Sequence, residues 1–501
     1  MTRKKKLLLN TLTGLLKQAV TVVCGFILPR YMLLYYGSSV NGLISSMANF
    51  LSFISLLDMG VGAVVQANLY KPLAERDTDQ MSRIIISSER FFRKLAYIFL
   101  AYIAVLCVVF STAIDTSYDT WFTVSLLLIV SASTLAQYLF GMTYQLLLNA
   151  DQKSYVQLIL QIVTIALNTL FSVILMRLGC SVHIVKLTTA ALYVLRPLLQ
   201  LLYVRRHYRI NRRVELVGEP IKQKWNGFSQ HLAAVVCQNV DIAVLTVFST
   251  LENVSVYSVY YAVTNGVEQI VMTAATGVES LFGDMIAKGE KKELSKAFDA
   301  VEWITHTGVT VVFTITALTI VPFVSVYTRG ITDADYIAPV FGALLVIAYA
   351  AQCLRIPYFR VIKAAGHFKQ TQNGAYISAL INTVLTVALV FRLGLVGAAI
   401  GTLAAMAYHT CYCVWYLRNN IMSRPLKPFI RYMITDCVIA AASYFLTRPF
   451  VFAGSSYGAW VLLAVKVSCV VVAVALAVNL LLYRSRMADI FGKLIRHGKR
   501  G

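Results

Sequence analysis

The sequence predicts an all-α, polytopic membrane protein with about fourteen transmembrane helices. The 501-residue chain is 58% hydrophobic and only 14% charged, whereas soluble domains are about a quarter charged. Its mean hydropathy is +0.69. Apolar runs of about 20 residues, each long enough to cross the hydrocarbon as a helix, recur along the whole chain. The connections between the runs are short, so we expect no extramembrane domain.

Polar and charged residues set the boundaries of the expected spans. Before the third span, the stretch MSRIIISSERFFRK (81–94) is amphipathic, and we expect it to lie along the membrane surface. The nine cysteines show no metal-ligand spacing, so we expect small core residues and no metal site. The fourteen spans are expected at 7–34, 41–69, 95–112, 121–148, 155–176, 182–204, 226–249, 255–286, 301–327, 337–361, 371–391, 396–417, 430–447 and 459–483.

The distribution of Lys and Arg between the loops predicts the orientation. With the N-terminus in the cytoplasm, the cytoplasmic loops and tails hold 34 Lys and Arg residues and the opposite loops hold four. Positive charge collects on the cytoplasmic side, so we expect both termini there and a multi-pass protein of the inner (cytoplasmic) membrane. The start MTRKKK is expected to belong to an uncleaved signal anchor. The basic excess is then a topological signal beside anionic lipid, not a nucleic-acid surface.

An internal repeat predicts the domain organisation. LNTLFSVILMRLG (167–179) is echoed by INTVLTVALVFRLG (381–394), and GVGAVVQANLYKPL (60–73) by GVESLFGDMIAKGE (277–290), both at an offset of about 215 residues. Six helices separate the copies, so they are parallel repeats, and such pairs commonly bind substrate between the halves. We expect a six-helix bundle at 1–206, a basic cytoplasmic linker at 207–225, a second bundle at 226–420, two further helices at 421–483 and a basic tail at 484–501.

Four acidic side chains, Asp58, Asp241, Glu268 and Glu279, fall well inside expected spans, where a charge costs roughly 2.5–3.5 kcal/mol. Asp241, in VVCQNVDIAVLTVF, lies roughly 20 Å and 10 Å from the two ends of its span, too far for its side chain to reach water. Glu268 and Glu279 are eleven residues apart and are expected on one face of one helix. Glu302, by contrast, lies near a cytoplasmic helix end, where we expect an interfacial position.

Two explanations of these acids remain open. The first explanation is that the acids form static ion pairs between helices. The second explanation is a hydrated central cavity in which the acids bind a coupling ion, Na⁺ or H⁺. We expect no cofactor besides this ion. We favour the cavity because polar stripes occur at the starts of both copies, including the stripe formed by His231, Ala234, Gln238 and Asp241.

Basic side chains inside the spans are candidates for binding an anionic substrate. Arg355 and Arg360, in QCLRIPYFRVIK, have no counterpart in the matching stretch of the first copy, GMTYQLLLNADQK, so they are less expected to be scaffold. Guanidinium groups match phosphate in a bidentate manner. Lys17, Arg30 and Arg196 complete the candidate substrate-binding set.

The segment LPRYMLLYYGSSVNGLISSMANFLSFISLLDMGVG (28–62) resembles the opening of the polysaccharide (O-antigen and exopolysaccharide) flippases. These belong to the multidrug/oligosaccharidyl-lipid/polysaccharide exporter superfamily. They too have an Arg-Tyr on the first helix, a glycine-bearing turn and a glycine-rich second helix. The usual Leu-Gly after Arg-Tyr is Met-Leu here, which shifts the outer turn.

The resemblance implies two bundles that alternate access. It also implies flipping of an undecaprenyl-diphosphate-linked oligosaccharide from the inner to the outer leaflet, driven by an ion gradient. Expected partners are the lipid-linked oligosaccharide, membrane lipids, and a polysaccharide polymerase or glycosyltransferases, with the flippase itself a monomer.

Two other functions compete with flipping. A cation-coupled multidrug or metabolite exporter of the same fold would favour an acid-lined cavity, whereas the charges here are mixed. A membrane enzyme needs a long external loop with catalytic residues. The longest outside loop, about 447–459, has only Arg448 as a charged residue. No catalytic triad or phosphate loop is visible, so we expect a transporter and not an enzyme.

The charge distribution makes a direct prediction of topology. Reporters fused after Lys71, Arg206, Lys291 and Gly501 should all report the cytoplasm. A paired alkaline phosphatase and fluorescent-protein fusion series measures this. An external signal at Arg206 would contradict the fourteen-helix topology, because the second copy would then be shifted by one span.

Overall fold

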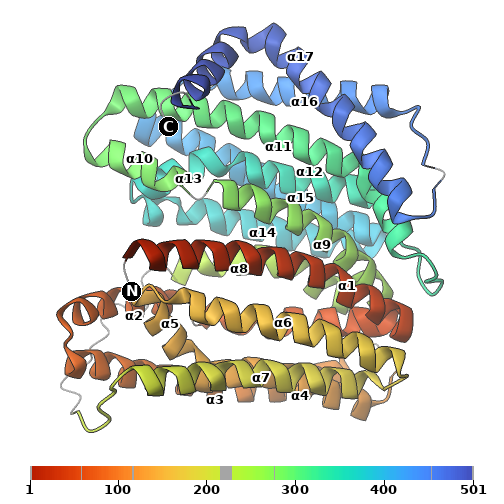
Figure 1. Ribbon diagram of the computed structural model, residues 1–501. Helices are drawn as coiled ribbons and strands as arrows, with labels where there is room; N and C mark the ends of the chain where they lie inside the picture. The colour runs from red at the N-terminus through yellow and green to blue at the C-terminus, as the bar shows by residue number, and fades with distance from the viewer. Residues whose placement is uncertain are drawn as a thin grey trace. The chain divides into compact units, whose positions relative to one another are not determined.

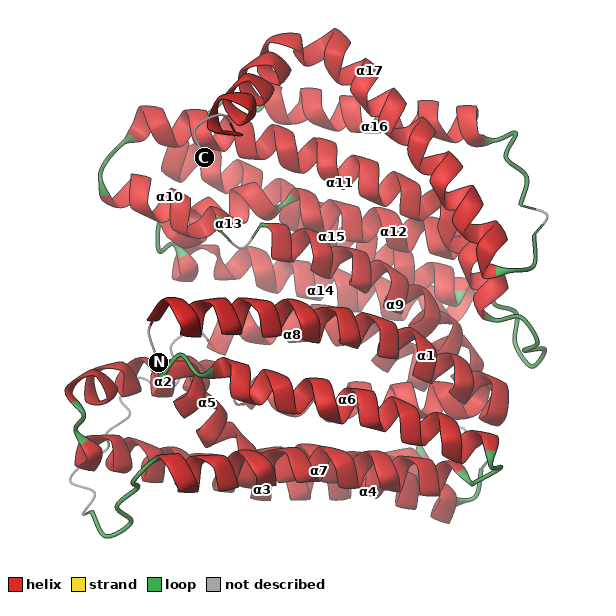
Figure 2. Ribbon diagram, viewed as in Figure 1, coloured by secondary structure: helices red, strands yellow, loops and turns green. Residues whose placement is uncertain are grey.

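All regular structure in the described residues is helical, which confirms the all-α polytopic fold (Figures 1 and 2). The computed structural model describes residues 3–57, 59–114, 118–214, 228–275, 277–452 and 454–498. Within these residues, 12 helices are long and apolar enough to cross a membrane, and Val235–Phe248 is a shorter apolar helix. One of the 12, Leu8–Leu56, contains the bend between the first two expected spans.

The chain forms two compact units, Met1–Ser255 (unit 1) and Val256–Gly501 (unit 2). The expected domain boundaries at 206, 226, 420 and 483 describe repeats and appendages, and they stay a prediction. Most of the expected linker lies outside the described residues, which resume at 228.

Unit 1 is built around a long first helix that bends at Gly37. The φ of 82° and ψ of 176° at Gly37 interrupt the helix, and glycine adopts such angles at little cost. The bend lies between the first two expected spans. The helix packs against α6 and α8. The elements of unit 1 are α1 (Arg3–Ser52), η1 (Phe53–Leu57), α2 (Met59–Glu75), α3 (Thr78–Thr112), α4 (Thr120–Ala136), η2 (Gln137–Gly141), α5 (Met142–Ala150), α6 (Ser154–Arg177), α7 (Val182–His207) and α8 (Phe228–Phe248).

The amphipathic stretch 81–94 does not form a separate surface helix. It is continuous with the third span in α3, whose N-terminus is capped by the Asp77 carboxylate. Ile84, Ile85 and Phe92 are buried in hydrophobic clusters of the unit. The apolar side of this stretch therefore packs against α2 and α5 and does not lie along the membrane surface.

The beginning of α1 is fixed by an ion cluster around Asp151, between α5 and α6. Lys6 and Lys153 pair with its carboxylate at 3.0 and 2.7 Å, and the Tyr208 hydroxyl donates to it at 2.5 Å. Burial raises the pKa of the Asp151 carboxyl, but these donors together outweigh burial, so its net pKa is lowered. The carboxylate stays ionised and holds three segments together.

Unit 2 contains the remaining helices and the last residues of the chain. The expected span 255–286 is interrupted, because α9 ends at Ala274 and α10 begins at Val278. Helices α14 and α15 pack closely along their length, and a Cβ at Gly397 would overlap the backbone of Leu389. The elements are α9 (Leu251–Ala274, whose first turn belongs to unit 1), α10 (Val278–Ala287), α11 (Lys291–Tyr327), α12 (Pro339–Leu354), α13 (Ile356–Ala364), α14 (Phe368–Leu393), α15 (Leu395–Leu417), η3 (Arg418–Met422), α16 (Lys427–Thr447) and α17 (Tyr457–Gly498).

The first pair of echoed segments adopts the same local structure in each unit. Asn168 in α6 and Asn382 in α14 are both buried. Each amide oxygen accepts from a hydroxyl one turn later, of Ser172 (3.4 Å) and Thr386 (3.2 Å). The glycine after each helix has a positive φ, of 73° and 53°. These shared details support the internal repeat.

A buried ion network joins α11, α13 and the loop before α16. Glu302 is 1% exposed, so it is buried in the unit and not interfacial as expected. Arg424 donates to Glu302 at 2.5 Å and pairs with Asp299 at 2.7 Å, and the Tyr358 hydroxyl donates to Glu302 at 2.5 Å. Burial lowers the pKa of Arg424, but the carboxylates of Glu302 and Asp299 outweigh burial and raise it.

Removing the charge of Glu302 should destabilise unit 2. Glu302→Gln leaves the half-buried Arg424 with only Asp299, and breaking a buried pair costs about 3 kcal/mol. Asp299→Asn is the matched control, because Asp299 is 38% exposed and an exposed pair contributes at most about 1 kcal/mol. Thermal unfolding in detergent should show the larger loss of stability for Glu302→Gln. An equal or larger loss for Asp299→Asn would contradict the buried Glu302–Arg424 pair as the stabilising contact.

Candidate functional site

Unit 1 contains a cavity of about 480 Å³ that two of the predicted substrate-binding residues line. The walls come from α1, α4, η2, α5, α6 and α7. They are formed by Lys17, Thr21, Ser133, Thr134, Gln137, Tyr138, Met142, Gln161, Ile165, Tyr193 and Arg196. The lining thus combines two cations, hydroxyls and amides, and it contains no acid.

Lys17 and Arg196 supply the positive charge of this cavity. Arg196 donates to the Gln137 side-chain oxygen at 3.3 Å and lies 5.8 Å from the centre of the Tyr193 ring. Among the described residues, no carboxylate lies within ion-pair distance of either cation. Two uncompensated cations in one concave site favour an anionic ligand.

A π-helical turn positions Gln137 toward Arg196. The turn Gln137–Gly141 interrupts the regular helix between α4 and α5, and such turns are frequent at functional sites. The Gln137 amide also donates to Gln145 at 3.0 Å, so both of its ends are used. A Cβ at Gly141 would lie 2.6 Å from the Gln137 side-chain oxygen. A glycine is therefore needed for this orientation.

Unit 2 holds a second polar cluster in which the predicted charges are paired. Arg360 donates to Glu279 at 2.6 Å, and Arg355 donates to His409 Nδ1 at 2.5 Å. The His409 ring therefore accepts at Nδ1. Gln352 donates to Glu268 at 2.5 Å.

Two cations lie near the aromatic ring of Phe359 in the same cluster. The Arg355 guanidinium lies 5.5 Å and the Lys363 ammonium 4.8 Å from the ring centre. Neighbouring partners thus satisfy Arg355 and Arg360, in contrast to Lys17 and Arg196.

Asp241 lies on α8 and is buried, with 3% of its surface exposed. Helix α8 is joined to α1 by hydrogen bonds near Asp241. Asn239 accepts from Asn49 (3.0 Å) and Ser52 (2.9 Å), and Ser46 and Thr246 share a hydrogen bond at 2.7 Å. These contacts hold α8 against α1 within unit 1.

The expected polar stripe around Asp241 is not one continuous surface. Gln238 is exposed whereas Asp241 is buried, so these two side chains have different environments. The side chains of His231 and Ala234 lie outside the described residues, as does Asp58.

The other predictions concern Arg30 and the expected shared helix face of Glu268 and Glu279. Arg30 is on α1, beyond the lining of the unit 1 cavity, and makes contacts of its own. Glu268 and Glu279 do not share one face of one helix, because α9 and α10 are distinct. Sequence reasoning missed Gln137 and Tyr193. The only signal was the run SASTLAQY (131–138), whose polar residues interrupt an apolar span.

Comparison with known proteins identifies the fold. No protein-family model and no curated protein matches the chain. Among solved structures, the lipid II flippase MurJ in an inward-closed conformation matches with a TM-score of 0.69 and 15% identity, over 96% of this chain and 100% of that one.

Multidrug resistance MATE transporters also match. An inward-facing MATE transporter of the MOP superfamily has a TM-score of 0.56 and 13% identity, over 82% of this chain and 94% of that one. A point mutant of the Vibrio cholerae MATE transporter VcmN has a TM-score of 0.56 and 12% identity, over 85% and 99%. The chain has the MOP-superfamily fold.

Proposed function

We propose that this protein flips a lipid-linked oligosaccharide diphosphate, of the undecaprenyl-diphosphate class, from the inner to the outer leaflet of the cytoplasmic membrane for polysaccharide biosynthesis. The observation that carries the proposal is the acid-free cavity of unit 1, with Lys17 and Arg196 in its wall. A diphosphate bears at least two negative charges, which two cations in a partly dehydrated cavity would neutralise. An organic cation would be repelled by the same wall.

The remaining lining of the cavity suits a sugar. Ser133, Thr134 and Gln161 offer hydroxyl and amide groups to glycan hydroxyls, and Tyr193 offers a ring face. A volume of about 480 Å³ lies within the range of small-molecule sites. The lipid tail would stay in the bilayer, so the cavity need hold only part of the head group.

The fold comparison supports a flippase over a drug exporter. MurJ is described as a lipid II flippase, and its match extends over 96% of this chain, against 82% and 85% for the two MATE transporters. The transport mechanism that we propose is alternating access driven by Na⁺ or H⁺. The candidates for binding the coupling ion are Asp241, Glu268, Glu279 and Asp58.

A cation-coupled multidrug or metabolite exporter is the second candidate. The cluster of Glu268 and Glu279 in unit 2 favours it, because acids attract organic cations. Yet Glu279 is paired with Arg360. An exporter should lower the accumulation of a lipophilic cation such as ethidium and should not depend on Lys17.

Neutralising both cavity cations should abolish flipping. A charge-assisted hydrogen bond contributes roughly 1.5–3 kcal/mol. Losing two of them should weaken diphosphate-lipid affinity about 100-fold or more. Lys17→Gln with Arg196→Gln should therefore fail to complement a flippase-null strain at a normal membrane level. The matched control is Lys186→Gln, on the same helix as Arg196 but outside the cavity lining, and it should complement. Complementation by the double variant would contradict the proposal.

Replacing Asp241 with Asn should separate ion coupling from a static role. Asn is nearly isosteric but cannot titrate. If Asp241 binds the coupling ion, Asp241→Asn should reach the membrane, lose gradient-driven flipping and keep gradient-independent exchange in proteoliposomes. If Asp241 is a structural partner, the variant should instead have lower expression and thermal stability. Full gradient-driven flipping by the variant would exclude the coupling role.

A further inference from the structure

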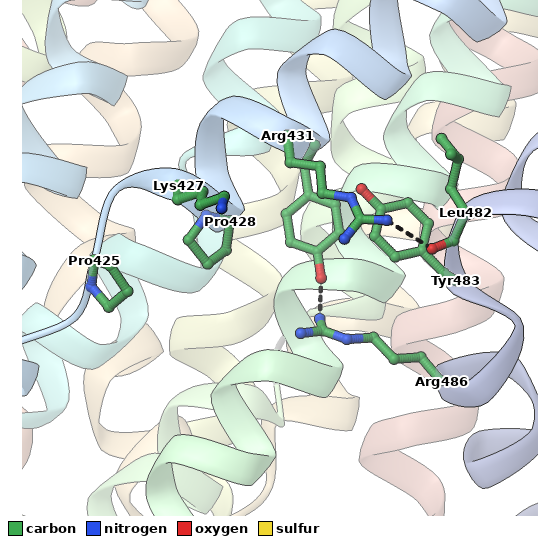
Figure 3. Close-up of a pocket in the computed structure, with 8 residues that line it drawn as sticks. Pro425, Lys427, Pro428, Arg431, Leu482, Tyr483 and Arg486 are labelled. Atoms are coloured by element: carbon green, nitrogen blue, oxygen red, sulfur yellow. Dashed lines mark hydrogen bonds between the residues drawn. The ribbon is translucent and has the colours of Figure 1, made fainter.

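A second pocket lies in unit 2 between α16 and α17 and is separate from the polar cluster described above. It has a volume of about 310 Å³ and lies where α16 begins and where α17 leaves its apolar segment (Figure 3). Three cations and two aromatic rings line it together with an apolar side chain: Lys427, Arg431, Arg486, Tyr432, Tyr483 and Leu482.

The two guanidinium groups are held by groups that carry no net charge. Arg431 donates to the Leu482 carbonyl at 2.8 Å and lies 4.7 Å from the centre of the Tyr483 ring. Arg486 donates to the Tyr432 hydroxyl and lies 5.7 Å from the centre of that ring. Figure 3 shows the two side chains reaching across from opposite helices. Because a guanidinium has five N–H donors, each keeps donors for a ligand.

The cations of this pocket lack acidic partners. Among the described residues, no carboxylate lies within ion-pair distance of Lys427, Arg431 or Arg486, whereas nearby Arg424 pairs with two carboxylates. The first turn of α16 adds the partial positive charge of a helix N-terminus. The helix α17 departs from helical geometry at Tyr483 (φ −135°, ψ 30°), so its direction changes at the pocket, just before Arg486. The site is thus a prearranged concentration of positive charge.

The surroundings of the pocket point to a lipid. The apolar segments Lys427–Thr447 and Tyr457–Arg484 begin and end, respectively, at this pocket, so it lies at the edge of the hydrocarbon. Ile430 and Ile434 on α16 and Leu481 on α17 are 53%, 60% and 83% exposed. Acyl chains can cover these side chains while a phosphate lies among the cations. Basic pockets at the ends of membrane helices are known to take anionic head groups.

We propose that this pocket binds the phosphodiester head group of an anionic membrane phospholipid, with phosphatidylglycerol as its simplest representative. The proposal rests on the membrane location and on the pocket itself, not on the transported substrate. A polyprenyl diphosphate offers the same phosphate chemistry, and the test therefore includes it as a separate ligand.

The experiment measures lipid binding to the purified full-length protein by native mass spectrometry. The wild type should bind phosphatidylglycerol at least tenfold more tightly than phosphatidylcholine of equal chain length. Arg431→Gln with Arg486→Gln should lose this preference. The matched control is Arg418→Gln with Arg484→Gln, which removes the same charge from two exposed arginines outside the pocket lining, and it should keep the preference.

Two further measurements keep the proposal testable if the double variant is unstable. Among the described residues Lys427 makes no hydrogen bond or ion pair, so Lys427→Gln should fold normally and weaken phosphatidylglycerol binding about threefold. In a competition measurement, phosphatidylglycerol should displace undecaprenyl diphosphate from the pocket.

Four results would overturn the proposal: equal binding of the two phospholipids by the wild type, an unchanged preference in the pocket variants, undecaprenyl diphosphate bound in the pocket and not displaced, or inorganic phosphate binding as tightly as phosphatidylglycerol. The last result would mean that the apolar rim contributes nothing. Complementation by the Lys17 and Arg196 variants tests the proposed function separately, because neither residue lines this pocket.

Discussion

The low dielectric constant of the bilayer is the constraint on which this structure depends. A charged side chain in a span must find a partner or a wet cavity, since lipid offers neither. The polar cluster of unit 2 meets the constraint by pairing, as in Arg360 with Glu279. The cavity of unit 1 differs, because Lys17 and Arg196 line an open volume without an acid. The polar cluster and the cavity thus treat their charges in opposite ways.

This difference separates charges that belong to the scaffold from charges that a ligand can reach. Paired charges are a stable part of the scaffold, and separating one pair costs several kcal/mol. Unpaired cations beside a cavity are available to a ligand, because binding replaces water and not an existing partner. The proposal of a diphosphate-bearing ligand therefore rests on the unpaired cations of the unit 1 cavity.

Much of the fold could be predicted from the sequence, because span length and hydropathy follow directly from the bilayer thickness. The bend at Gly37 falls where the apolar pattern pauses, and the echoed asparagines Asn168 and Asn382 share one local geometry. The break between α9 and α10 was not predicted, because the sequence predicts one span over 255–286 although Gly277 lies within it, and no proline marks the break.

The candidate site was harder to predict for a physical reason. Sequence spacing indicates which residues share a helix face, but it does not show which neighbouring helix that face meets. Arg355 and Lys17 therefore looked equivalent, yet only Arg355 meets a histidine on another helix. The role of Gln137 depends on a π-helical turn, which has no clear signature in a single sequence.

The wall of the unit 1 cavity constrains how the proposed ligand would be released. Every residue in its wall belongs to the same unit. A ligand held by Lys17 and Arg196 would therefore keep those contacts through any rigid rotation of one unit against the other. Rotation alone would change the side of the membrane to which the ligand is exposed, but it would not weaken the contacts that hold the ligand. Release of the proposed ligand would then need its contacts with Lys17 and Arg196 to be replaced, by a competing anion or by water entering beside Gln137.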